Sequence, residues 1–567
     1  MASLYQKKIS GRTYWYLREM ARVEGVPRMV SERYLGTAED IAAAVEGATV
    51  EPDRTRHLGF GAVAAVWGVL ARLDVAGTVD AAITGQPPGL PLSVGTYIAL
   101  ATLNRVVDPC SKLGFAAWWA TTAADRFTRI PARALDHRRF WDAMRAVTIE
   151  QLEQVEAQVA ARVIGEYGLD TSSVALDMTN FSTYIHSANG KAPIAQRGKA
   201  KQKRTDLRLV GLGLVVTRDG GVPLLSHAYP GNKPDVTQFP TMIDALCARH
   251  AALAPGSAGA PDSQVTVVFD AGQNSVANFA HLAETRLHYI GSVPASDCPD
   301  LLALPASRRA VVDPDRFGGL SALDTRRSVY GQDRRTVLTH SPELHAAQAR
   351  SFTDTTLAKA CKALDELAAT LARGKTRRER ARVEAEIEKI TADTWVRRVI
   401  GWQLAGDTPA EHRLSWHIEP TAVAALETEI FGKHVLITDH DDWPVAEVVA
   451  GYRSQSEAEF SFRQMKDPRV VSFSPMHHFT DHNIRVHTQT CVFALQIAHL
   501  MRRTADRAGL HLSVRELIDQ LAGIQETVLI YPSTGGRPKA RRMITETTPT
   551  QDQLAQIFQL DRYAPRT

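Results

Sequence analysis

The sequence predicts a multidomain α/β protein, and three observations carry that prediction. The chain has 567 residues, 44% of them hydrophobic, which is enough for roughly two to four domains with sizeable cores. Apolar residues recur at helical spacing between residues 57 and 165. Further along, short apolar runs typical of buried strands alternate with helical stretches, which is the pattern of an α/β core.

The two N-terminal segments differ in their patterns. Residues 1–56 predict a small basic β module, because aromatic and polar residues alternate in "RTYWYLREMARVEGVPRMVSERYLG" and "EGVP" has the composition of a turn. Residues 57–165 predict an all-α domain, because four apolar stretches at helical spacing are separated by Gly and Pro breaks.

The α/β pattern begins after residue 166 and is interrupted once. Within 166–300, "SSVALD" and "VTVVFD" look like strands, and "LRLVGLGLVVTRDGGVPLLSHAYPG" looks like a hairpin. Residues 301–430 are irregular and include a charged helical stretch, so they predict an inserted domain. The strand "HVLITD" resumes the pattern within 431–505, and 506–567 are predicted to be a C-terminal tail.

Composition points to the cytoplasm and leaves the partner open. The net charge is +4, so any contact with nucleic acid must come from local basic patches. The five cysteines are scattered without a C-x-x-C pair, which argues against a disulfide framework and a zinc-thiolate site. The start lacks the apolar core of a signal peptide, and no run of about 18 apolar residues follows. A soluble cytoplasmic protein with no membrane partner is expected.

One predicted helix, 451–467 or "GYRSQSEAEFSFRQMKD", carries a polar stripe beside an apolar one. The apolar stripe consists of Ala458, Phe462 and Met465. The polar stripe consists of Tyr452, Gln455, Glu459, Arg463 and Lys466. An amphipathic surface helix with Glu459 and Arg463 paired is the simpler interpretation, unless Glu459 has partners elsewhere in the chain.

Candidate partners of Glu459 are two acids at the ends of predicted strands. Asp177 closes "SSVALD" and Asp270 closes "VTVVFD". Each could simply cap a turn. Three carboxylates that converge at strand ends would instead suit hard Mg²⁺ ions, and two ions about 4 Å apart catalyse phosphodiester displacement. That chemistry predicts a nucleic-acid substrate.

A basic segment follows Asp177 closely and could hold phosphates, although a solvated loop is the alternative. Its basic residues are Lys191, Arg197, Lys199, Lys201, Lys203, Arg204 and Arg208.

These residues resemble the DDE transposases of bacterial insertion sequences whose catalytic helix carries a Y-x2-R-x3-E-x6-K signature. Tyr452, Glu459 and Lys466 match its spacing, while Gln455 stands where the signature has Arg. The stretches "DGGVPLLSHAYPGNKPDVTQF", "VVFDAGQNS" and "SPMHHFTDHNIRVHTQTCVFALQIAHLM" also look like motifs of one sub-group, in the expected order. The resemblance runs from about residue 90 to 505.

The resemblance implies an RNase H-like core with a large insertion domain between Asp270 and Glu459. It implies that Asp177, Asp270 and Glu459 are the catalytic and metal-binding acids, with two Mg²⁺ ions for which Mn²⁺ can substitute. Such an enzyme cleaves the transposon ends and joins them to target DNA, and it is expected to act on double-stranded DNA as a homodimer, associated with the bacterial nucleoid.

The resemblance also suggests which residues contact DNA. Phosphates near the cut would be held by the predicted DNA-binding residues Tyr452, Gln455, Arg463, Lys466, Lys199, Lys201, Lys203 and Arg204. The helical domain 57–165, helped by the basic N-terminal sheet, is predicted to bind the transposon ends, with the candidate contacts Arg105, Lys112, Arg138 and Arg139.

Three other interpretations remain. A structure-specific nuclease of the same fold would cleave DNA without joining it to a target. A non-catalytic DNA-binding relic would usually have lost one of the acids, and here all three positions are acidic. A zinc site is the alternative for the closely spaced histidines His477, His478, His482 and His487.

Overall fold

The computed structural model describes most of the chain, in two compact units. The described residues are 2–23, 26–47, 51–198, 206–253, 265–375, 377–474, 476–532 and 539–566. One unit combines residues 1–68, 114–133 and 516–567, and the other combines 69–113 and 134–515. The predicted all-α segment 57–165 is therefore divided between the two units.

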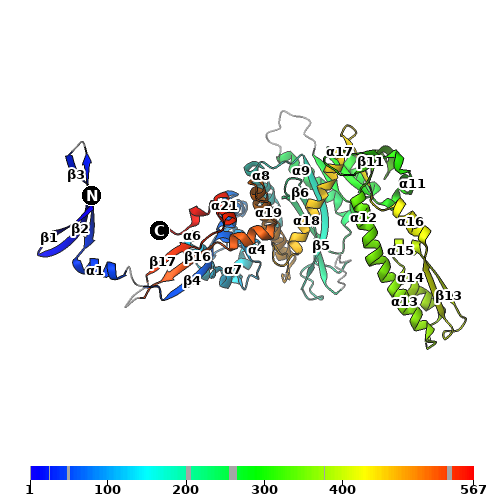
Figure 1. Ribbon diagram of the computed structural model, residues 1–567, viewed down its shortest axis with the longest axis horizontal. Coiled ribbons are helices and arrows are strands. Elements are labelled where there is room, and N and C mark those ends of the chain that lie inside the picture. Colours follow the sequence, from blue (N-terminus) through cyan, green and yellow to red (C-terminus); the bar gives the residue numbers. More distant parts are fainter. Residues whose placement is uncertain are drawn as a thin grey trace. The chain divides into compact units, whose positions relative to one another are not determined.

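The larger unit is built on a nine-stranded mixed sheet, which confirms the predicted α/β class (Figure 1). The strand order is β10-β11-β12-β15-β9-β8-β5-β6-β7. The first five strands in the chain are β5 (Ser173–Thr183), β6 (Arg208–Thr217), β7 (Pro223–Pro230), β8 (Thr266–Phe269) and β9 (His288–Val293). The remaining four are β10 (Ala310–Val311), β11 (Ser321–Val329), β12 (Gln332–His340) and β15 (Lys433–Thr438).

Two kinds of pairing meet at β5. Strands β5, β6 and β7 form an antiparallel meander, as the Asp-Gly-Gly turn in the sequence predicts. On its other side β5 pairs in parallel with β8, and β8 pairs in parallel with β9. Parallel neighbours need crossover connections, which are provided here by α9 (Phe239–Leu253) and α10 (Val276–Ala283).

The helices that position the candidate site pack directly on this sheet. Helix α18 (Gln455–Lys466) contacts β5 and β6, and α17 (Val445–Arg453) contacts β8, β9 and β15. The long helix α19 (Asp481–Arg507) contacts α18 and β7. Figure 1 shows α18 running alongside β5.

The inserted segment is shorter than the predicted range 301–430. Strands β10, β11 and β12 belong to the main sheet, so a separate hydrophobic cluster begins only near Phe352 and ends at Phe431. Its elements are α12 (Pro342–Ser351), a π-helical stretch (Phe352–Leu357), α13 (Ala358–Ala372), α14 (Arg380–Ile390), α15 (Thr394–Val399), β13 (Ile400–Ala405), β14 (Arg413–Ile418) and α16 (Pro420–Glu429).

The helical segment within the larger unit surrounds one buried helix. Helix α4 (Val94–Val107) is buried over most of its length, and it packs against α3 (Val75–Ala82), α7 (His137–Ala146) and α19. Helix α8 (Ile149–Tyr167) connects this segment to the sheet by its contact with β7. Its first turn carries a capping box formed by Thr148 and Gln151.

The smaller unit contains the end of the chain, which is folded rather than a tail. Strand β16 (Gln525–Ile530) lies between β17 (Ala540–Ile544) and β4 (Arg54–Gly59), a strand almost 470 residues earlier. Its helices are α20 (Val514–Ala522), α21 (Pro549–Ile557), α5 (Phe115–Trp119), α6 (Ala124–Thr128) and the beginning of α2 (Gly61–Arg72). A pairing between strands so far apart leaves no local pattern in the sequence.

Residues 2–36 form a three-stranded antiparallel sheet of their own. Its strands are β1 (Ala2–Ile9), β2 (Arg12–Val23) and β3 (Val26–Gly36), and α1 (Ala38–Gly47) follows. Within the described residues, no single helix is long and apolar enough to cross a membrane. Helices α2 and α3 would pass as a pair by length and composition, but they are bent by 47° at their break.

Candidate active site

Asp177 and Asp270 lie side by side at the parallel junction of the sheet. Leu176 of β5 is paired with Phe269 of β8, so the next residue on each strand is one of the two acids. Adjacent strands lie about 4.8 Å apart, so the backbones that carry the two acids are direct neighbours in the sheet. Asp177 accepts a hydrogen bond from its neighbouring amide Met178 at 2.7 Å, and Asp270 accepts one from Gly272 at 3.0 Å.

Both acids face the helices α17 and α18. Side chains alternate along a strand, so Thr179 shares a face with Asp177. Thr179 accepts a hydrogen bond from Lys466 of α18 at 2.7 Å. On β8, Val268 packs in one hydrophobic cluster with residues of α17, and Asp270 follows two positions later in extended backbone.

Glu459 lies on α18, between two contacts of this helix with β5. One helical turn before it, the Gln455 amide donates to the carbonyl oxygen of Leu176 at 3.1 Å. Two turns after it, Lys466 reaches Thr179. Residues spaced four and seven apart lie on one side of a helix, so Glu459 is on the side of α18 that runs along β5.

Tyr452 connects the three acids electrostatically. Its hydroxyl is hydrogen-bonded to Ser292 on β9. Burial raises the pKa of Tyr452 to about 12, and the charges of Asp270, Glu459 and Asp177 contribute to the rise. A carboxylate shifts a neighbouring pKa only at short range. The charges of all three acids therefore act on one hydroxyl group.

The donor set fits Mg²⁺, because carboxylate oxygens are the ligands this ion prefers. Among the described residues, the three carboxylates do not form a group whose oxygen atoms all lie within 4.8 Å. Ions between them would therefore be bound through one or two carboxylates each, with water completing the shell, which is the usual way that proteins bind Mg²⁺.

The predicted helix 451–467 is two helices. Helix α17 ends at Arg453 and α18 begins at Gln455, with Ser454 between them. The Ser454 hydroxyl donates to the carbonyl of Gly451 at 2.6 Å, a local bond that competes with helical hydrogen bonding. Tyr452 and Glu459 therefore belong to different helices, although their spacing matches the signature.

The predicted DNA-binding residues on α18 differ in exposure. Arg463 is exposed and Lys466 is half-buried beside the Phe181 ring, at 5.5 Å from its centroid. Gln455 is buried, and its amide is used within the protein, so its position does not favour the predicted phosphate contact.

The basic segment after Asp177 is only partly described. Lys199, Lys201, Lys203 and Arg204 lie outside the described residues. Lys191 and Arg197 are exposed. Arg208 is buried and donates to the carbonyl oxygens of Ala192 and Asn189, at 2.9 and 2.7 Å, so it fixes the loop instead of facing DNA.

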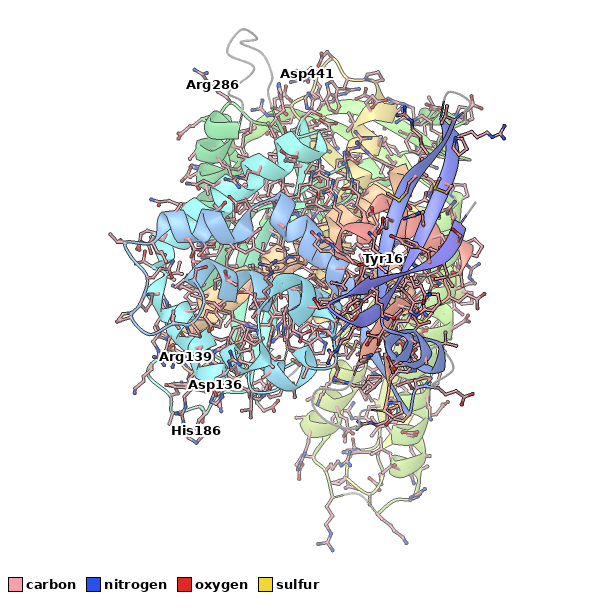
Figure 2. The ribbon with its side chains drawn as sticks, turned by 90° about the vertical axis from the view of Figure 1, so that its left-hand side faces the viewer. Tyr16, Asp136, Arg139, His186, Arg286 and Asp441 are labelled. Carbon is pink, nitrogen blue, oxygen red and sulfur yellow. The ribbon has the colours of Figure 1, made fainter. Side chains whose placement is uncertain are left out.

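The four basic candidates in the helical segment fall into two groups. Arg138 and Arg139 are exposed on α7, and Figure 2 labels Arg139 at the surface. Arg105 is buried and donates to the carbonyl oxygens of Ser472 and Cys110. Lys112 is 9% exposed, and its burial lowers its pKa to about 7. Arg105 and Lys112 are therefore not on a DNA-reading surface, contrary to the prediction.

The alternative zinc site is not assembled in the described residues. His482 contacts the carbonyl oxygen of Met144, and His487 contacts that of Phe473. Burial lowers the pKa of His478 to about 3. The four predicted histidines do not form a group with ligand atoms within 4.8 Å of one another.

A different group, His288, Asp439 and His440, does bring its ligand atoms within 4.8 Å. The two imidazole rings lie 4.3 Å apart and are tilted by only 34°, and His440 also stacks on Trp443 at 3.8 Å. Two of its ring nitrogens have partners within the protein, because His288 Nδ1 is hydrogen-bonded to Asp439 at 2.9 Å and His440 Nε2 to Thr266 at 2.8 Å. In this structure the group is a hydrogen-bonded His–Asp pair beside an aromatic stack.

The sequence analysis missed Thr179, which belongs to the site, and Glu457, which holds α18 from outside the site. Thr179 accepts a hydrogen bond from Lys466. Its position two residues after Asp177 could have indicated that both side chains lie on the same face of the strand. Glu457 accepts from Arg502 of α19 at 3.2 Å, which connects α18 to the helix behind it. No local pattern indicates this second contact.

Comparisons with known proteins find little. No protein-family model matches the chain, and no curated protein matches it. Among solved structures, a cryo-EM structure of a piggyBac transposase synaptic complex with hairpin DNA is similar, with 8% identity and a TM-score of 0.38. The similarity covers 81% of this chain and 78% of that chain.

Proposed function

We propose that this protein is a DDE-type transposase that binds the terminal inverted repeats of an insertion sequence, cleaves the transposon ends and joins them to target DNA. The observation that carries the proposal is the placement of Asp177 and Asp270 directly after the paired residues Leu176 and Phe269 of β5 and β8, beside the helix α18 that carries Glu459. The spacing of Tyr452, Glu459 and Lys466, which matches the family signature, supports it.

Two Mg²⁺ ions held by the three carboxylates would activate the attacking hydroxyl group and stabilise the leaving oxygen of an in-line displacement. The residues around them orient the DNA. Tyr452 stays protonated at neutral pH because its pKa is about 12, so its hydroxyl can donate to a phosphate oxygen. Lys466 brings a positive charge to the same face of the sheet through its contact with Thr179.

The RNase H-like core is proposed to be strands β5 to β9. The support is their arrangement, an antiparallel meander followed by two parallel strands, with two of the acids at the junction. The segment from α12 to α16 is proposed to be the insertion domain, because it has its own hydrophobic cluster between Asp270 and Glu459. We further propose a cytoplasmic protein that works as a homodimer on DNA, since two transposon ends must be brought together.

The test is cleavage by single variants of the acids. The substrate is the genomic DNA flanking the reading frame, searched for inverted repeats, with Mg²⁺ or Mn²⁺. Asp177→Asn, Asp270→Asn and Glu459→Gln are each expected to abolish cleavage and to retain DNA binding, because loss of a negative charge reduces repulsion from phosphate.

Glu457→Gln is the matched control, because Glu457 lies on the same helix as Glu459 but is paired with Arg502. It is expected to keep most of the activity. Cleavage at the wild-type rate by any one of the three acid variants would remove that residue from the site and contradict the proposal.

A structure-specific nuclease of the same fold is the second candidate, because the same acids would serve both reactions. The two are separated by products. A transposase yields transposon ends covalently joined to a target plasmid, whereas a nuclease yields cleaved ends only.

A further inference from the structure

The N-terminal sheet β1–β3 exposes nearly all of its side chains. Among its described residues only Gly36 is buried, although the sheet includes four tyrosines and a tryptophan. Met29, Val30 and Tyr34 are about half-exposed, and Tyr34 has 56% of its surface accessible. Aromatic side chains that a chain holds in order without burying them are typical of a binding surface.

One face of this sheet concentrates the tyrosines. Residues directly opposite each other on paired strands share a face. Tyr5 is opposite Tyr16, which is opposite Tyr34, and Lys7 is opposite Tyr14. Figure 2 labels Tyr16 on this sheet. We call the surface formed by Tyr5, Lys7, Tyr14, Tyr16, Arg18, Glu32 and Tyr34 the tyrosine face. On it Glu32 accepts hydrogen bonds from the Tyr5 hydroxyl and from Lys7, at 2.5 and 3.0 Å.

Contacts within the tyrosine face hold its side chains in place. The rings of Tyr5 and Tyr16 are stacked at 5.5 Å, and those of Tyr16 and Tyr34 meet edge to face at 5.3 Å. The Arg18 guanidinium lies 3.9 Å from the centre of the Tyr5 ring. Lys7 Nζ lies 5.0 Å from the centre of the Tyr16 ring. Ordered rings and cations lose little conformational entropy when a partner binds.

The opposite face carries Trp15 and Leu17, which alternate with the tyrosines of β2 and are half-buried, as Tyr14 and Tyr16 are. Helix α1 contacts β2 and β3. The turn into α1 is fixed by Asp40, whose carboxylate accepts from the Thr37 amide at 2.7 Å.

The charge of the sheet identifies the class of partner. Residues 2–36 contain three acidic residues and seven basic ones, which leaves +4, the net charge of the whole chain. The basic residues are Lys7, Lys8, Arg12, Arg18, Arg22, Arg28 and Arg33. A second copy of the same sheet would meet like charge, whereas a polyanion would meet opposite charge.

Geometry favours duplex DNA among polyanions. Three strands spaced by about 4.8 Å present a surface about 10 Å wide, close to the width of about 12 Å of the major groove. Strands that lie in a groove are an established way for proteins to contact DNA. Tyrosine hydroxyls and basic side chains suit phosphates and base edges.

We propose that the tyrosine face of the β1–β3 sheet binds double-stranded DNA in the major groove. The inference rests on the proposed function in that DNA is the substrate, but it assigns DNA contact to a surface that includes none of the acids. It specifies which face of the N-terminal sheet contacts DNA and which groove that face enters.

The test compares two adjacent lysines in the full-length protein. Lys7 belongs to the tyrosine face, while Lys8 is opposite Thr13 on the other face. Lys7→Ala is expected to lower the slope of log K against log salt by about one unit on duplex DNA, and Lys8→Ala by much less. Tyr34→Ala is expected to weaken binding about tenfold. Both altered side chains are about half-exposed, so thermal stability should be unchanged.

Equal slopes for Lys7→Ala and Lys8→Ala, or unchanged affinity of Tyr34→Ala, would overturn the inference. If Tyr34→Ala changed the sedimentation coefficient of the protein and left its DNA affinity unchanged, the inference would also be overturned, because the tyrosine face would then bind a second copy of the chain. Asp270→Asn separates this inference from the proposed function. If Asp270→Asn binds DNA but does not cleave it, the result supports both the DNA-binding sheet and the proposed active site. If Asp270→Asn binds and also cleaves DNA, the result contradicts only the proposed active site.

Discussion

Gln455 stands where the family signature has Arg, and its burial gives a physical reason for the difference. Only 5% of Gln455 is exposed, and its amide donates to the carbonyl oxygen of Leu176, next to Asp177. A neutral amide can be buried at modest cost when it is hydrogen-bonded, but a guanidinium group would have to lose its hydration. The side chain positions α18 over β5 and is not placed to meet phosphate.

Gln455→Arg is therefore expected to destabilise the protein and reduce cleavage. The expected loss of stability is on the order of 2 kcal/mol, because a charge would be buried without a partner. The measurement is the melting temperature together with the cleavage rate. Arg463→Gln is the control on the exposed side of α18, and its melting temperature should match the wild type. Stronger DNA binding by Gln455→Arg with unchanged stability would contradict the structural assignment.

Lys466 offers a test that separates charge from position. Lys466→Met removes the positive charge next to Thr179 and is expected to reduce cleavage about tenfold or more, since hydrogen bonds to charged groups are worth about 1.5–3 kcal/mol. Thr179→Val keeps the charge and removes only its anchor, so a smaller loss is expected. Equal losses in both variants would mean that Lys466 acts only through its contact with Thr179.

His499 makes stability depend on pH. The side chain is fully buried, its Nδ1 contacts the carbonyl oxygen of Gly221 at 2.7 Å, and burial lowers its pKa to about 3. Between pH 6.5 and 3 the unfolded chain binds a proton at this residue and the folded chain does not. Stability is therefore lost as pH falls through that window, by roughly 2 kcal/mol between pH 7 and 5.

The measurement for His499 is the change in melting temperature from pH 7 to pH 5. His499→Asn keeps a donor for Gly221 and removes the titration, so its change should be smaller than that of the wild type. A change as large as that of the wild type would assign the pH dependence to other groups.

At the scale of elements, α18 is held by an apolar stripe that borders the stripe carrying the acid. Phe462 is 4% exposed, whereas Phe460 is half-buried and lies against Arg502. Phe462→Ala is expected to cost about 3 kcal/mol, because it leaves a cavity under the helix. Phe460→Ala is the matched control and should cost clearly less. Urea unfolding followed by circular dichroism would compare them, and equal costs would contradict the orientation of α18.

The sequence predicted those elements whose signals are local. Apolar runs indicated β5, β8 and β15, the Asp-Gly-Gly turn indicated the β6–β7 hairpin, and helical spacing indicated α4 and α8. The neighbourhood of Asp177 and Asp270 followed from their places at strand ends. The break at Ser454 was missed because a single serine within a polar helix pattern carries no strong helix-stop signal.

Pairings between distant segments could not be predicted from the sequence alone. Strand β12 pairs with β15 across the inserted segment, so the boundary of the insertion was set too early. Strand β4 pairs with β16 near the opposite end of the chain, so the C-terminal segment looked like a tail. The buried positions of Arg105 and Lys112 were also missed. Basic residues are usually exposed, and burial by distant segments leaves no local pattern in the sequence.

At the scale of the whole molecule, each compact unit contains, among its described residues, a buried glutamate that is paired with an arginine from a distant part of the same unit. In the smaller unit the Glu526 side chain is fully buried and paired with Arg126 and Arg542. In the larger unit Glu156 of α8 is paired with Arg249 of α9 at 2.8 Å. Removing one partner of a buried pair leaves an uncompensated charge, which typically costs about 3–5 kcal/mol.

The two glutamates therefore allow a reciprocal test of whether the units are independent in stability. Glu526→Gln should lower the hydrogen-exchange protection of amides in β4 and β16 and leave β5 and β8 unchanged. Glu156→Gln should do the opposite, because its partner Arg249 and the Ser226 hydroxyl that it accepts from belong to the larger unit. If either variant lowers protection equally in all four strands, the chain unfolds as one cooperative unit, and the division into two parts describes its contacts but not its stability.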